Sequence, residues 1–398
     1  MKFKENPILI ERNSYIINGL QNRLRIILFY VFKLLPINNK KIVIQCYKDM
    51  GYCDSLKYIC EELISQKIDC HIVWITKKDY VYQFPNVVNL IPTNTFRAIK
   101  ELSTAKIWID NCRKNSWVRK RPTQFYLETW HNGISLKRVE GEAEKALSKQ
   151  YIRSAKNDSR MVNVFLSNSD FATNRLRQSF WYTGYILEFG LPRNDILFKY
   201  SNTTFTQTIK RKVSKTLGIP CKNKILLYAP TFRRDFSTKT YLKDFSEIIK
   251  ILGLKTKWTI IEHFHPNIQR FNTSYEHSKG SIDADNYEDF QELLLVSDIL
   301  ITDYSSTMFE FSFMKKPVFL YTPDVEEYKR DRNFTFRLED LPWTQSKTPT
   351  ELATAITFFD NDIYLYNLEK FMKQLKLYDT GIASKATVEI LNQILKGE

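Results

Sequence analysis

Short apolar runs alternate with segments of helical periodicity along most of the chain from residue 40 onward. Runs of this length, bounded by turn-forming or charged residues, are typical of strands buried on both faces of a parallel sheet. We expect strands at residues 42–46, 71–76, 87–91, 107–111, 124–130, 162–168, 225–229, 258–265, 299–301 and 317–321. Because the same strand–helix rhythm occurs in both halves, the pattern predicts an α/β protein with two similar lobes, mostly parallel sheets and a cleft between them.

A polar, threonine-rich and glycine-free stretch at residues 201–215 marks the expected crossing between the lobes. We therefore predict three parts: a basic N-terminal segment at residues 1–39, an N-terminal lobe at 40–200 and a C-terminal lobe at 201–398.

The N-terminal segment combines cations with an apolar stretch. The first 41 residues hold eight Lys/Arg and two Glu, and residues 24–36 are mainly apolar and aromatic. This stretch is too short and too charged to cross a bilayer, which takes about 20 apolar residues. It suits either a helix that lies in an anionic membrane surface or a helix packed on the first lobe.

Composition narrows the class of partner. The 398 residues carry a formal net charge of +15, which predicts attraction to nucleic acid, anionic lipid or phosphate-rich substrates. Five cations in nine residues at 113–121 form either a solvated loop or a surface for headgroups or a phosphate polymer. The six cysteines include no CxxC pair, so we interpret them as free buried thiols of a reducing cytoplasm.

Small hydroxyl residues follow the strand at 299–301. Ser305, Ser306 and Thr307 lead into a helical pattern at 308–314. A strand that turns into a helix in this way directs backbone N–H groups at one point, which suits a phosphate or pyrophosphate. The alternative is that Ser305 only caps an ordinary helix.

Other strand ends of the second half also carry side chains that suit a phosphate or pyrophosphate. One strand ends at Pro230 and Thr231 with Arg233 just beyond, and another ends at His263 and His265. The carboxyl ends of parallel strands meet at one edge, where ligands bind, and cations with hydroxyls there favour a pyrophosphate site. The two histidines lie on one side of their strand, but no third ligand has recognisable spacing, so we predict no metal and no cofactor.

In the first half, His131 stands at the end of the strand at 124–130, followed by Gly133 and an expected helical segment. A lone histidine is often structural, but here it would face the pyrophosphate site across the cleft. Since histidine can take a proton from a hydroxyl near neutral pH, this arrangement predicts a transferase that works by positioning and charge stabilisation.

Five motifs occur in one order, and together they resemble the CDP-glycerol glycerophosphotransferase family, which makes teichoic acids and related capsular polymers. They are Trp130-His131-Asn132-Gly133 with Leu136-Lys137, Gly190-Leu-Pro-Arg-Asn-Asp195, Tyr228-Ala-Pro-Thr-Phe-Arg233, His265-Pro266 and Thr302-Asp-Tyr-Ser-Ser306. The resemblance covers residues 40–340 and implies a metal-independent, GT-B-like fold.

The resemblance also implies an activity. The enzyme would move a polyol phosphate, glycerol phosphate first, from a CDP-activated donor to a membrane-anchored acceptor and release CMP. Its partners would be the CDP-polyol, a polyprenyl-linked or polymeric acceptor and an anionic membrane surface, with no nucleic acid. It would be a peripheral protein on the cytoplasmic face of the membrane.

The roles that the resemblance implies follow the motifs. His131 would be the base, and His265 would contact the donor phosphates and could stabilise the leaving group. Glu310 would accept a hydrogen bond from a hydroxyl of the transferred group. The other substrate-binding residues would be Asn132, Gly133, Ile134, Ser135, Arg193, Pro230, Thr231, Arg233, Ser305 and Ser306.

Three departures from the family bear on the donor. The family often has Gly-Thr-Pro after the first histidine, an arginine where this chain has His263, and an aspartate where it has Glu310. In these positions the chain is more similar to the capsule-associated branch than to the wall teichoic polymerases. Two alternatives stay open: a GT-B glycosyltransferase that uses a nucleotide sugar, and a protein that binds nucleic acid or another polyanion.

Overall fold

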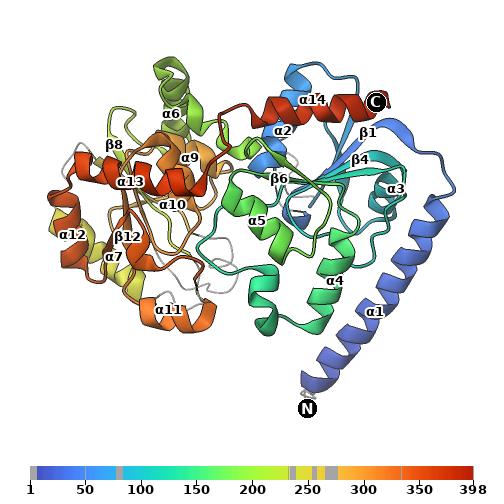
Figure 1. The fold of residues 1–398 in the computed structure, drawn as a ribbon, viewed down its shortest axis with the longest axis horizontal. Coiled ribbons are helices and arrows are strands. Elements are labelled where there is room, and N and C mark those ends of the chain that lie inside the picture. The colour runs from blue at the N-terminus through green and yellow to red at the C-terminus, as the bar shows by residue number, and fades with distance from the viewer. Residues whose placement is uncertain are drawn as a thin grey trace, which may run out of the picture.

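Two parallel sheets, each covered by helices, lie side by side in the computed structural model (Figure 1). The structure describes residues 7–49, 51–77, 84–231, 233, 239–252, 258–264, 277–332 and 334–397. The α/β class and the two Rossmann-like lobes predicted from the apolar pattern are confirmed.

The first sheet has the order β3-β2-β1-β4-β5-β6-β7, and its strand pairs are parallel. Its strands are β1 (Asn38–Gln45), β2 (His71–Thr76), β3 (Asn89–Pro92), β4 (Ala105–Asp110), β5 (Phe125–Glu128), β6 (Val164–Ser167) and β7 (Tyr185–Glu188). Alternate side chains of a strand point to opposite faces. Val43 therefore packs in one core with Phe29, while Ile42 and Ile44 pack in a second core with Leu56.

Helices cover both faces of this sheet. On one face α1 packs on α3, and on the other α2 packs on α14. The helices of this lobe are α1 (Pro7–Phe32), α2 (Asp54–Ser65), α3 (Phe96–Thr104), α4 (Lys149–Ser159), α5 (Asp170–Ser179) and α14 (Ala383–Lys396), with short 3-10 turns η1 (Cys46–Lys48), η3 (Glu140–Ala146) and η4 (Pro192–Asn194).

The second sheet has the order β10-β9-β8-β11-β12-β13, again with parallel pairs. Its strands are β8 (Lys224–Tyr228), β9 (Trp258–Glu262), β10 (Ile282–Asp283), β11 (Ile299–Thr302), β12 (Val318–Tyr321) and β13 (Thr344–Ser346). The sequence did not predict β10 and β13, because strands of two and three residues are too short to show periodicity. Its helices and 3-10 turns are η5 (Leu197–Lys199), α6 (Thr203–Leu217), α7 (Lys239–Leu252), α9 (Phe290–Val296), α10 (Thr307–Phe311), η6 (Ser312–Met314), α11 (Val325–Arg332), η7 (Leu338–Asp340), α12 (Pro349–Thr357) and α13 (Asn361–Leu375).

The end of the chain returns to the first lobe. Helix α14 lies beside α2 along the top of the first lobe in Figure 1, and its Val388 and Leu391 are buried in the core of that lobe. The Asp195 carboxylate accepts hydrogen bonds from the backbone N–H groups of Ala383 (3.0 Å) and Ser384 (2.7 Å), which holds the start of the helix. The predicted assignment of residues 201–398 to one lobe is therefore wrong for this helix.

Helix α1 is both packed and exposed. Its Phe29 is fully buried against the first lobe, whereas Leu20, Leu24, Ile27 and Val31 are each at least half exposed. These four lie at i, i+4, i+7 and i+11, so they form one outward apolar stripe. No helix among the described residues is long and apolar enough to span a membrane.

The cationic cluster at residues 113–121 is largely structural. Buried Arg113 lies 3.3 Å from the carboxylate of Asp158, and buried Lys114 lies 2.6 Å from that of Asp110. Charges paired in the interior cannot also bind a polyanion at the surface. Neither alternative left open by the sequence, a solvated loop or a surface for headgroups or a phosphate polymer, therefore holds for these two cations.

Candidate active site between the lobes

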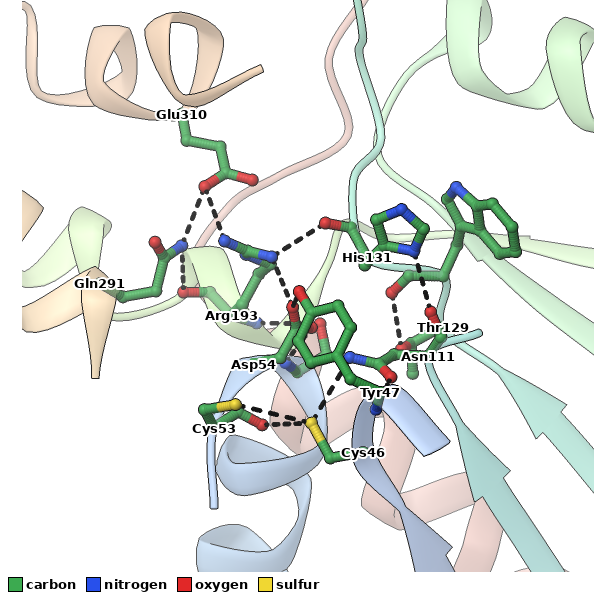
Figure 2. Close-up of polar contacts among 12 residues, drawn as sticks. Cys46, Tyr47, Cys53, Asp54, Asn111, Thr129, His131, Arg193, Gln291 and Glu310 are labelled. Atoms are coloured by element: carbon green, nitrogen blue, oxygen red, sulfur yellow. Dashed lines mark hydrogen bonds and ion pairs between the residues drawn. The ribbon is translucent and has the colours of Figure 1, made fainter. Parts of the chain in front are cut away.

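His131 lies at the end of β5 with its ring held by a neighbouring strand end. The ring Nδ1 is 3.1 Å from the carbonyl oxygen of Asn111, which follows β4 (Figure 2). Since a carbonyl can only accept, Nδ1 must carry the proton in the neutral ring, and this assignment leaves a lone pair on Nε2. Burial lowers the pKa of His131 below its usual value, although the hydrogen bond to Asn111 opposes this. The ring is therefore a neutral proton acceptor at pH 7.

The backbone around His131 is unusual. Trp130 has φ +55°, in the left-handed region, and its ring lies 4.5 Å from that of His131 between centroids. At Gly133 a Cβ atom would lie 1.9 Å from the side-chain oxygen of Asn168, so only glycine fits there. The expected helix does not follow directly: residues 132–139 are irregular and the 3-10 turn η3 begins at Glu140.

The irregular segment after His131 reaches the second lobe. Ile134 and Leu136 are buried in the core of that lobe, and the Leu136 carbonyl accepts a hydrogen bond from the N–H of Thr335 at 2.8 Å. Asn132 and Gly133 are half-buried, and Ser135 is buried. His131 therefore lies where the two lobes meet.

An ion-pair network joins His131 to the second lobe. The Arg193 guanidinium donates to the carbonyl oxygen of His131 (2.9 Å) and pairs with Asp54 (2.5 Å) and with Glu310 of α10 (3.3 Å; Figure 2). Gln291 of α9 also donates to Glu310 at 3.2 Å. Two of the residues that were predicted to bind substrate, Arg193 and Glu310, thus bind each other.

Tyr47, Asp54 and Asn111 also belong to this region, and none of them was predicted from the sequence. Tyr47 follows β1, and its hydroxyl donates to Asp54 at 2.5 Å, while its N–H donates to the side chain of Asn111 at 2.7 Å. Burial raises the pKa of Tyr47 well above its usual value, so the hydroxyl stays protonated. Only its place after a predicted strand could have indicated this role.

In the second lobe the ends of two neighbouring strands meet. Strands β8 and β11 are paired and lie where the strand order of the sheet reverses. Thr231, just after β8, donates its backbone N–H to the Asp303 carboxylate (2.9 Å) and its hydroxyl to the same group (3.1 Å). Such reversal points are where open α/β sheets bind ligands.

Arg233 lies in the same place but is already paired. Its guanidinium is 2.7 Å from the Asp303 carboxylate, also binds Asp324, and lies 5.1 and 5.2 Å from the ring centroids of Tyr304 and Tyr328. The side chain is 8% exposed, so it contributes little free positive charge to a ligand. No pattern in the sequence indicated a role for Asp324.

The serine turn leads from β11 into a helix as expected, but Ser305 is not the residue at the N-cap position. Ser306 stands at the N-cap position of α10 without a side-chain cap hydrogen bond, and the Ser305 hydroxyl lies 2.8 Å from that of Thr307. Both serines are half-exposed, and Pro230 beside Thr231 is buried. Because Glu310 lies on α10, this turn is connected through Arg193 to His131. His265 lies outside the described residues.

One cluster of side chains beside β9 brings its potential ligand atoms close enough together to hold a metal ion. His277 lies 3.2 Å from Asp283 and 3.2 Å from Asp285, and its Nδ1 lies 2.9 Å from Glu262. Burial lowers the pKa of His277, but the carboxylates of Asp285 and Glu262 raise it overall to about 10. At neutral pH the ring is thus a charged ion-pair partner of these carboxylates.

The comparisons with known proteins agree with this geometry. The family model of CDP-glycerol:poly(glycerophosphate) glycerophosphotransferase matches residues 27–395. The teichoic acid poly(glycerol phosphate) polymerase of Bacillus spizizenii is 29% identical over 97% of this chain and 99% of its own length. The polymerase of the same name from Staphylococcus epidermidis is 28% identical over 90% of this chain, which spans 51% of it.

Solved structures give the same result. A histidine-to-asparagine variant of the wall teichoic acid polymerase TagF with CDPG is 27% identical, with a TM-score of 0.84 over 98% of this chain and 97% of that one. A UDP-GlcNAc 2-epimerase at 14% identity and TM-score 0.50 shares the fold alone, which is GT-B-like. The chain belongs to the CDP-glycerol:poly(glycerophosphate) glycerophosphotransferase family, whose activity is the transfer of glycerol phosphate from CDP-glycerol in teichoic acid synthesis.

Proposed function

We propose that this protein transfers glycerol phosphate from CDP-glycerol to a hydroxyl at the end of a membrane-anchored teichoic acid acceptor and releases CMP. The observation that carries this is His131: a neutral ring between the lobes, its Nδ1 bound to the Asn111 carbonyl and its Nε2 able to accept a proton.

In the proposed reaction Nε2 of His131 takes the proton of the acceptor hydroxyl. The resulting oxygen attacks the phosphorus that carries glycerol, a new phosphodiester bond forms, and the bond to the CMP oxygen breaks. The donor pyrophosphate would lie at the strand ends that hold Thr231, Ser305 and Ser306, where backbone N–H groups and hydroxyls can donate to it. His265 keeps its predicted role at the donor phosphates.

Two residues that were predicted to bind the substrate receive a different role in this proposal. Arg193 and Arg233 are each paired with two carboxylates, so we assign them to positioning: Arg193 holds the His131 backbone against α10, and Arg233 holds the ends of β8 and β11. Glu310 would act in the same way, through Arg193.

The protein would work as a peripheral enzyme at the cytoplasmic face of the membrane. The outward stripe of α1 (Leu20, Leu24, Ile27 and Val31) supports this, since apolar side chains on one face of a basic helix can insert between lipid headgroups. The anchored acceptor would then reach the site from the membrane side.

The test is to incubate purified protein with an acceptor primer and, in turn, CDP-glycerol, CDP-ribitol or nucleotide sugars. We expect CMP only from CDP-glycerol, and His131→Gln should lower the rate roughly 10²–10⁴-fold, the usual contribution of a general base. Release of a nucleoside diphosphate from a nucleotide sugar would instead establish the glycosyltransferase alternative.

A further inference from the structure

A cationic groove lies along α4, outside the site described above. It is a shallow depression, open to solvent, of about 470 Å³, and it is lined by Lys149, Arg153, Lys156 and Arg160, together with Ile152, Asn157 and Glu144. Lys149, Arg153 and Arg160 are exposed and Lys156 is half-buried.

The four cations form one row. They stand at i, i+4, i+7 and i+11, and residues at such spacings lie on one face of a helix. With a rise of about 1.5 Å per residue, successive cations are about 4.5–6 Å apart along the helix axis. A row of this kind matches a linear ligand that carries negative charges at short, regular intervals.

Little within the groove neutralises these charges. Glu144 is the one carboxylate that lines it, and it lies 3.9 Å from the Lys156 ammonium, with both side chains more than 40% exposed. An exposed pair of that length is weak. The groove therefore keeps a strong positive potential.

The opposite face of α4 ties the groove to the catalytic lobe. Asp158 is buried and binds Arg113, whose guanidinium lies 5.5 Å from the centroid of the Trp130 ring. Trp130 directly precedes His131. The groove and the proposed base thus belong to one packed unit.

We propose that this groove binds the phosphodiester backbone of the growing acceptor polymer, a linear chain with one phosphate in each polyol unit. The proposal rests on the proposed function, since the polymer is that reaction's acceptor and product. Bound there, the chain behind the reacting end would be held on the lobe that carries His131 while the donor site is refilled.

An anionic membrane surface is the competing occupant, because α4 lies on the same side of the first lobe as the free end of α1 in Figure 1. A membrane-surface helix inserts large apolar side chains, and on α4 only Tyr151, 37% exposed, is a large exposed hydrophobic residue. The apolar stripe is on α1.

The experiment compares the full-length protein with two variants that each lose four positive charges. The groove variant is K149Q/R153Q/K156Q/R160Q, and the control is R211Q/K215Q/K370Q/K373Q, which changes exposed cations of α6 and α13 in the second lobe. The probes are fluorescent glycerol-phosphate oligomers of short and long defined length, and vesicles of phosphatidylglycerol and phosphatidylcholine.

For the unmodified protein we expect tighter binding of long than of short oligomers, with an affinity that falls as salt rises. The groove variant should bind long oligomers roughly tenfold or more weakly, from the loss of four exposed charge contacts, and its KM for long acceptors should rise with little change in kcat. The control should match the unmodified protein.

Equal oligomer binding by the groove variant and the unmodified protein would overturn the proposal. Loss of vesicle binding with oligomer binding intact would overturn it in favour of the membrane. Since equilibrium binding needs no turnover, a protein that binds oligomers through the groove but releases no CMP would contradict the proposed function and leave the groove assignment standing.

Discussion

At the scale of single residues, the chemistry depends on which atom carries a proton. The Asn111 carbonyl accepts from Nδ1 of His131, so the lone pair stays on Nε2, and burial keeps the ring neutral. A backbone carbonyl cannot titrate, so the tautomer is constant across the pH range in which the ring is neutral.

This arrangement predicts the acid limb of the pH–rate profile. Only neutral His131 can accept a proton, and its pKa lies below the usual 6.5, so kcat/KM for transfer should rise with pH, and the midpoint of this rise should lie below pH 6.5. The measurement is initial rate of CMP release between pH 4.5 and 8. His71→Gln, a change at an exposed histidine of β2, serves as the control and should leave the profile unchanged. An acid limb centred above pH 7 would show that another group is the base.

At the scale of elements, α1 shows how one helix can serve two surfaces. Phe29 packs against the ring of Trp108 at 6.4 Å between centroids, which attaches the helix to the first sheet. Arg121 donates to the Phe32 carbonyl at 3.0 Å and so caps the end of the helix. The stripe on the other side is left facing outward.

We predict that L24Q/I27Q/V31Q weakens vesicle binding at least 100-fold, because three buried aliphatic side chains at about 1–2 kcal/mol each contribute about 3–6 kcal/mol. Glutamine is a good helix former and these positions are exposed, so the thermal midpoint should change little. Co-sedimentation with phosphatidylglycerol vesicles measures the effect. The matched control is F358Q/I363Q/Y366Q, which removes three exposed apolar side chains of the second lobe. If both variants lose the same affinity, α1 is not the specific anchor.

At the scale of the whole molecule, buried ion pairs hold the lobes together. The Lys57 ammonium of α2 lies 2.5 Å from the carboxylate of Asp289, which caps α9 of the second lobe. The Tyr58 hydroxyl donates to the same carboxylate at 2.8 Å. With the Arg193–Glu310 pair, this makes two charged contacts between segments that are more than 100 residues apart in sequence.

Lys57→Met should lower the free energy of unfolding by about 3 kcal/mol, because Asp289 would remain buried without its cation, whereas nearby Glu292 keeps Lys212 at 2.7 Å. K57M/D289N should recover part of this loss, since asparagine still caps a helix and removes the unpaired charge. Urea unfolding measures both, with Lys100→Met at an exposed position of α3 as the control. Equal stability of K57M and the unmodified protein would mean that the pair contributes nothing.

Much of the fold could be predicted from the sequence because its signals are local. A buried strand such as Ile299–Thr302 is visible as an apolar run, and the five ordered motifs were enough to indicate the family. The strand ends with Thr231 and Ser305 were expected at one edge, and β8 and β11 are indeed neighbours.

What the sequence could not decide was which charges pair. From the sequence, four cations could each have been available to bind phosphates: Arg113, Lys114, Arg193 and Arg233. The structure pairs each of them with carboxylates. The row on α4 was not singled out by any pattern in the sequence, and the structure leaves it at the surface.

The sequence by itself therefore determined the α/β class, most of the strand positions and the family, since these follow from periodicity and short motifs within a few residues. Only the tertiary structure decided the tautomer of His131, the return of α14 to the first lobe, and which cations stay accessible to an anionic ligand. The physical reason is distance along the chain: whether a charge is free or paired depends on partners such as Glu310 for Arg193, which only folding brings within about 3 Å.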